Sequence, residues 1–125
     1  HFTLGSHSAV NAGGNSFIAM LFSSVDGISK VGYYAGSSSG LTITTGFAPR
    51  FLILKNITDN GSGWIVLDTT RGWGSGNDYA LNINNSEAQN NFDDIGYPTS
   101  TGFYVGTVNS QYNAANKNYI YYAHA

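Results

Sequence analysis

The sequence contains no cysteine, so a disulfide scaffold, a thiolate metal site and a cysteine nucleophile are all excluded. Charge is also scarce: charged residues make up 10% of the chain and the net charge is −2, whereas a typical protein has about a quarter charged residues. With only five lysines and arginines, the chain lacks the basic patch that a phosphate backbone requires. We therefore expect no nucleic-acid partner.

Long hydrophobic runs are missing as well. The longest, such as Phe51–Leu54, fall far short of the roughly 20 apolar residues of a membrane helix, so no membrane span is expected. No signal-like start is present and the first residue is His1, so we expect a chain that was processed, tagged or cut from something longer. A chain of 125 residues buries a sizeable core without disulfide or metal staples.

Gly, Ser, Asn, Thr and Tyr replace the missing charge, and this mixture favours strands joined by tight turns. Apolar alternation predicts strands at 16–22, 28–34, 41–45, 50–55, 64–68, 79–83, 102–105 and 118–122, with a polar segment at 84–91 that could hold one helical turn. The turn at 59–63 makes 50–55 and 64–68 the clearest hairpin. We predict an all-β fold, an antiparallel, jelly-roll-like β-sandwich of about nine short strands.

The two ends of the chain resemble each other. Phe2, Leu4 and Gly5 match Phe103, Val105 and Gly106 at a spacing of 101, and after one inserted residue Ser8, Asn11, Ala12, Phe17 and Ile18 match Ser110, Asn113, Ala114, Tyr119 and Ile120 at a spacing of 102. The alternative is that any two hairpins with Gly/Asn turns look alike. Order and spacing favour a true repeat. We therefore expect residues 1–23 to end a preceding module or to serve in assembly, and 24–125 to form the sandwich.

Several strings carry a family resemblance: TGFAPRFLILKN, GWIVLDTTRG, YALNINNSEA, GFYVGT and YNAANKNYIYYA. Together they resemble a repeated β-rich domain of unassigned biochemistry found in tail-fibre and other tail proteins of bacteriophages, especially marine and cyanobacterial ones. The sequence departs from that pattern where Glu87 precedes Ala88 and where Gly74–Gly76 replaces a basic stretch. The resemblance implies a virion location and a structural or adsorption role.

Catalytic and metal-binding patterns are weak. Asp93-Asp94 is the only adjacent carboxylate pair, but neighbours on a strand point to opposite faces, whereas a glycosidase needs two carboxylates facing each other. No G-x-S-x-G elbow is present, and His7 and His124 have no acidic neighbour to orient them. The turn at 59–62, or Asn77-Asp78, could supply two or three calcium ligands, but a turn explains both and no D-x-D-x-D-G pattern is present. We expect no enzyme activity, no cofactor and no metal.

Loop aromatics give the more informative candidates. Trp73 lies between glycines and Tyr97 precedes Pro98, while Asn77 and Asp78 could fix sugar hydroxyls below an aromatic face. These four residues form a candidate glycan site. The alternative reading is that Trp73 folds back over the end of the sandwich as a plug.

Two further sets of residues have expected roles. Asp68 and Arg71 should meet and brace the loop that follows 64–68, and Pro49 should open a strand where no N–H is needed. Tyrosines and apolar residues at both ends of the chain are expected at an interface: Phe17, Met20, Tyr119, Tyr121 and Tyr122.

Three functions remain open from the sequence. The first is a non-enzymatic structural module of a phage tail fibre or related appendage, which partners copies of itself or neighbouring repeats and also contributes to host attachment. The second is a carbohydrate-binding module that takes a host-surface glycan, and the third is a glycan hydrolase. Exposure of Trp73 with polar partners would favour the second, and two facing carboxylates in one cleft would favour the third.

Overall fold

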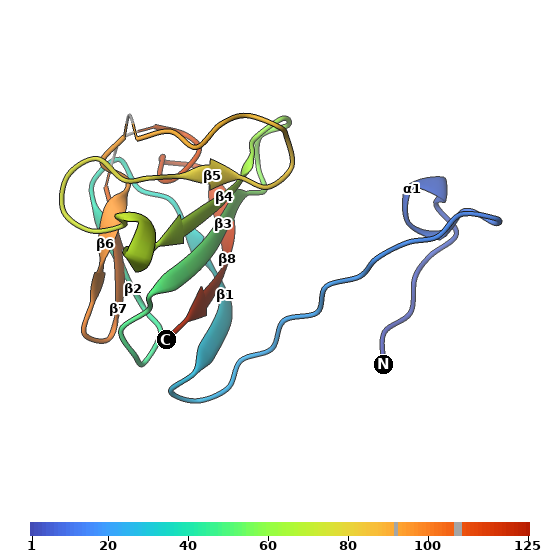
Figure 1. Ribbon diagram of the computed structural model, residues 1–125, viewed down its shortest axis with the longest axis horizontal. Helices are drawn as coiled ribbons and strands as arrows, with labels where there is room; N and C mark the ends of the chain where they lie inside the picture. Colours follow the sequence, from blue (N-terminus) through green and yellow to red (C-terminus); the bar gives the residue numbers. More distant parts are fainter. Residues whose placement is uncertain (92, 107–108) are drawn as a thin grey trace.

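A computed structural model describes residues 1–91, 93–106 and 109–125 (Figure 1). In these residues the chain forms two short helical turns, α1 (Ser8–Asn11) and the 3-10 turn η1 (Thr69–Arg71). Its strands are β1 (Ser29–Ala35), β2 (Leu41–Thr44), β3 (Phe51–Asn56), β4 (Trp64–Asp68), β5 (Leu81–Asn82), β6 (Gly96–Thr99), β7 (Gly102–Val105) and β8 (Asn118–His124). The predicted all-β sandwich is confirmed.

The strands form two antiparallel sheets. The larger sheet has the order β1-β8-β3-β4-β5 and the smaller one β2-β7-β6, so β8 and β7 are both interior strands. Apolar side chains of both sheets meet in one core, whose largest fully buried members include Tyr119, Phe103, Leu52 and Leu54. The alternation of buried and half-buried residues along β3 shows that one face of the larger sheet lines this core and the other faces outward.

The predicted hairpin of 50–55 and 64–68 is confirmed as β3 and β4. Two local predictions differ from the structure: 84–91 holds no helical turn, and Tyr97, expected in a loop, lies on β6. Ser8–Asn11 forms one turn of helix. Pro98 is tolerated because β6 lies at the edge of its sheet, where a missing N–H leaves no interior ladder incomplete.

Residues 1–22, here called the arm, lie outside the sandwich. Figure 1 shows the arm leaving the start of β1 and projecting away from both sheets, with α1 near its far end. The strand predicted at 16–22 pairs with no other strand of the described chain. Its apolar side chains are instead open, with Ile18 96% and Met20 72% exposed. The arm therefore presents an apolar strand sequence without a sheet.

Candidate functional site

The structure does not support the glycan site proposed around Trp73. The Trp73 side chain is only 3% exposed and packs edge-on against Phe103, with ring centroids 6.4 Å apart. A buried indole offers no face to a sugar, so the binding role predicted for Trp73 is wrong and the alternative, a plug at the end of the core, describes it.

Asp78 is likewise a structural residue. It is 1% exposed, and its carboxylate accepts hydrogen bonds from the backbone N–H groups of Gly74 (2.9 Å), Ile95 (2.8 Å) and Gly96 (3.0 Å). Burial raises the pKa of Asp78, and the three N–H donors oppose that rise. These bonds tie the Gly-rich loop to the entry of β6, so the prediction of a ligand-binding Asp78 is wrong.

The other two residues of that candidate site lie apart from a shared pocket. Asn77 is exposed, and Tyr97 on β6 is 43% exposed and stacks on Tyr104 with ring centroids 5.0 Å apart. Both are open to solvent, but with Trp73 and Asp78 buried the predicted cluster has no stacking face and no free carboxylate.

Asp68 and Arg71 do not form the predicted ion pair. Asp68 instead caps η1, where its side chain accepts the N–H of Thr70 at 2.7 Å. The Nε and Nη2 atoms of Arg71 are buried and have no hydrogen-bond partner among the described residues. The Asp68 side chain is satisfied locally because its own turn brings an N–H group two residues away within reach. Pro49 is fully buried just before β3 begins, at the strand opening where it was expected.

Two of the predicted interface tyrosines face the core. Tyr119 is 0% and Tyr121 6% exposed, and both pack against Tyr34. The interface role predicted for them is therefore wrong, because their side of β8 is the one that meets the smaller sheet. Tyr122, on the opposite side, is half-buried and points outward.

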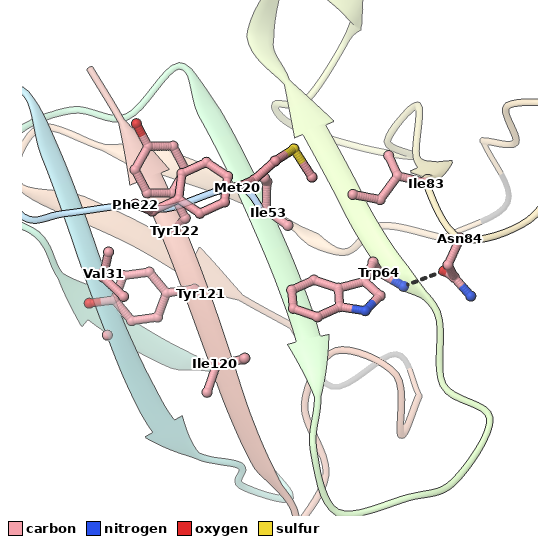
Figure 2. Close-up of a pocket in the computed structure, with 11 residues that line it drawn as sticks. Met20, Phe22, Val31, Ile53, Trp64, Ile83, Asn84, Ile120, Tyr121 and Tyr122 are labelled. Atoms are coloured by element: carbon pink, nitrogen blue, oxygen red, sulfur yellow. Dashed lines mark hydrogen bonds between the residues drawn. The ribbon is translucent and has the colours of Figure 1, made fainter. Parts of the chain in front are cut away.

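The outward side of the larger sheet carries an apolar groove of about 530 Å³. Strand register places Val31 opposite Tyr122, and Tyr122 opposite Ile53, so one row of apolar side chains crosses β1, β8 and β3. Trp64, Ile83, Asn84 and Ile120 continue the lining (Figure 2). The side-chain Oδ1 of Asn84 already accepts a hydrogen bond, from the backbone N–H of Trp64 at 2.7 Å.

The end of the arm lies over this groove. Met20 and Phe22 belong to its lining, and Phe22 packs against Tyr122 with ring centroids 4.5 Å apart (Figure 2). Three of the predicted interface residues therefore lie on the outer surface, as an interface role requires: Phe17, Met20 and Tyr122. The groove itself was not identified from the sequence, although the nearly continuous apolar run of 50–55 indicated that both faces of that strand are apolar.

The carboxylates of the described chain do not converge on this groove, since none belongs to its lining. Asp59 instead pairs with Lys117 at 2.5 Å, and this hydrogen bond holds the pKa of the Asp59 carboxyl below its usual range. Asp93 accepts a hydrogen bond from Asn109 at 2.9 Å.

No group of three potential metal ligands occurs within residues 1–91, 93–106 and 109–125. None of the helices described is long and apolar enough to cross a bilayer.

Comparison with protein families gives one match, which covers residues 1–125 and is described as a domain of unknown function, DUF7483. The chain belongs to this family. No curated protein matches it, and no solved structure matches it. The matched span of the DUF7483 family includes the arm as well as the sandwich.

Proposed function

We propose that this chain is a non-enzymatic structural module, a β-sandwich bead that joins like modules in a phage tail fibre or related virion appendage. The observation that carries the proposal is the apolar groove on the outer face of the larger sheet, which the sandwich leaves uncovered apart from the end of the arm. Contiguous exposed apolar surface is characteristic of protein–protein contact sites.

The chemistry of the groove fits a protein partner better than a glycan or a reaction. Its lining is mostly aliphatic and aromatic, and the side-chain carbonyl oxygen of Asn84 is already engaged. A sugar would need several free hydrogen-bonding groups, and hydrolysis would need two facing carboxylates. A neighbouring module, by contrast, can bury this surface against its own apolar side chains.

The arm supports the same role, because it carries a second unpartnered apolar surface on the same chain. Phe2, Leu4, Phe17, Ile18 and Leu21 are all between 46% and 96% exposed. The phage setting is supported by the resemblance of the sequence strings, and attachment to a host surface would be a further task of such an appendage.

Sedimentation velocity of the full chain tests the assembly role. We expect self-association at micromolar concentration, and loss of association in the double variant Val31→Lys/Trp64→Lys. The two side chains are 42% and 39% exposed, so charge at these sites is tolerated without unfolding. Thr42→Lys, at an exposed position on the smaller sheet, is the matched control and should associate normally. A monomer at all concentrations, or equal association of both variants, would contradict the proposal.

The virion location has a separate test. Antibodies raised against the chain should label the tail appendages of intact phage particles, seen by immunogold electron microscopy. Labelling of bacterial cells alone would place the protein elsewhere.

A further inference from the structure

The arm repeats the local structure of residues 109–117, which precede β8, as well as their sequence pattern. In the arm, the His7 carbonyl accepts the N–H groups of Val10 (3.1 Å) and Asn11 (3.0 Å). At a spacing of 102 residues, the Asn109 carbonyl accepts those of Tyr112 (3.3 Å) and Asn113 (3.2 Å). The same turn of backbone therefore occurs twice.

Side-chain and later backbone bonds repeat at the same spacing. His7 Nδ1 accepts the Ala9 N–H at 3.1 Å, as Asn109 Oδ1 accepts the Gln111 N–H at 2.8 Å. The Ala12 carbonyl accepts from Asn15, and the Ala114 carbonyl from Lys117, both at 3.3 Å. Gly14 and Asn116 share a left-handed backbone, with φ 82° and 65°.

Residues 102–124, here called the β7–β8 unit, are central to the sandwich. β7 lies between β2 and β6, and β8 lies between β1 and β3. Asn113 anchors its part of the chain to the sandwich, because its side chain accepts the Ser37 N–H at 2.7 Å and donates to the Ser39 carbonyl at 2.9 Å. The equivalent Asn11 donates only to Gly5 of the arm itself, at 3.0 Å. The arm therefore carries the turn of the β7–β8 unit without the sandwich around it.

The arm does not match the space that the β7–β8 unit occupies in this sandwich. At the spacing of 102, Ala19 would take the position of Tyr121, and Leu21 would take the position of Ala123. Tyr121 packs on Phe103 with ring centroids 5.2 Å apart, and Ala123 is 0% exposed. Replacing β8 by the arm would leave a cavity at the Tyr121 position and overpack the Ala123 position. The chain's own β7–β8 unit therefore fits these two positions better than the arm does.

The mismatch also describes the sandwich that the arm would fit. Tyr121 fills the space beside Gly32, where an added Cβ would lie 2.5 Å from the tyrosine hydroxyl. A strand carrying Ala at the Tyr121 position frees that space for a side chain on β1. Conversely, Leu21 needs smaller neighbours than Ala123 has here.

We propose that the arm is the β7–β8 unit of a second DUF7483 sandwich, one that carries a side chain where this chain has Gly32. By inserting into both sheets of that neighbour, the arm links two sandwiches through main-chain ladders as well as apolar contacts. The inference names the partner within the proposed assembly role and rests on it.

A rescue experiment in the full chain tests the proposal. Tyr119→Asp places an unpaired carboxylate at a fully buried position and should abolish folding through the chain's own β8. Ala19→Tyr/Leu21→Ala, added to that variant, gives the arm the inner residues of β8. The arm can reach the vacant position because six residues, 23–28, connect it to β1, the antiparallel neighbour of β8.

Cooperative thermal unfolding and near-ultraviolet circular dichroism report the outcome. We expect Tyr119→Asp to be unfolded, the triple variant to recover a cooperative transition, and Phe17→Asp, the arm counterpart of Tyr119→Asp, to remove it again. An unfolded triple variant would overturn the equivalence of the arm and the β7–β8 unit. Recovery by Tyr119→Asp with the natural arm would overturn the claim that the partner differs from this sandwich.

These outcomes are distinguishable from failure of the proposed function. The rescue concerns folding within the chain and gives the same answer whether or not the outer groove associates. Loss of self-association with intact rescue would contradict the assembly role alone.

Discussion

The ring of Tyr121 occupies the space that a side chain on Gly32 would need. The two residues are direct register partners in β1 and β8, and a Cβ built on Gly32 would lie 2.5 Å from the Tyr121 hydroxyl oxygen and 2.6 Å from the adjoining ring carbon. The tyrosine also packs on Phe103 of the opposite sheet. A glycine on an outer strand thus allows an aromatic side chain from the neighbouring strand to lie across it and close the core.

Gly32→Ala should lower the free energy of unfolding by about 1–3 kcal/mol, the usual range for overpacking a well-packed site. Urea denaturation measures this change. Gly13→Ala, where an added Cβ meets no atom within 4 Å, is the control and should have little effect. In a Tyr121→Ala background the cost of Gly32→Ala should largely disappear, and an undiminished cost there would show that the two residues are not coupled.

Asp78→Asn should destabilise the sandwich although it preserves size. The substitution replaces one carboxylate oxygen with an NH₂ donor that faces the N–H groups now bonded to Asp78, and an unpaired buried donor costs about 1–3 kcal/mol. Urea denaturation of Asp94→Asn, at an exposed carboxylate, gives the matched control. Equal stability of the two variants would mean that the buried bonds contribute nothing to folding.

The buried tyrosines should make the protein sensitive to alkali. Burial, and secondarily the nearby Tyr119, raise the pKa of Tyr34 above its ordinary value of 10.0, while burial, and secondarily Asp93, raise the pKa of Tyr112 to about 12. The Tyr34 hydroxyl also donates to the Tyr112 carbonyl at 2.5 Å. Because the folded state holds these protons more tightly than the unfolded state, their stabilising contribution is complete below about pH 10 and is lost as the pH rises through the folded pKa.

Denaturation curves between about pH 9 and pH 12, with phenolate absorbance recorded in parallel, measure this effect. Tyr34→Phe should flatten the decline, since it removes one of the groups with a raised pKa. Tyr33→Phe, at a side chain that is 78% exposed, should leave the decline unchanged. If the exposed substitution flattened it equally, burial would not be the cause.

Features that depend on near neighbours along the chain follow from the amino-acid sequence alone. Strand-forming residues between Gly/Asn turns produce the antiparallel ladders, and the turn at 59–63 produces the β3–β4 hairpin. The duplicated turn of the arm is equally local, because the hydrogen bonds that it shares with the β7–β8 unit join residues two to four positions apart. It therefore forms in the arm without a sandwich around it.

Two other features depend on tertiary packing: the face of each strand that is buried, and the β7–β8 sequence that fills the sandwich. Alternation shows that Tyr119 and Tyr121 share a face, but β8 is apolar on both sides, so the pattern does not reveal which side meets the smaller sheet. Trp73 is buried and Trp64 is 39% exposed, although both are tryptophans beside glycines. The arm and the β7–β8 unit contain the same turn, and the fit of Tyr121 beside Gly32 and of Ala123 within the core favours the second. Close packing of this kind is a property of residues far apart in the chain.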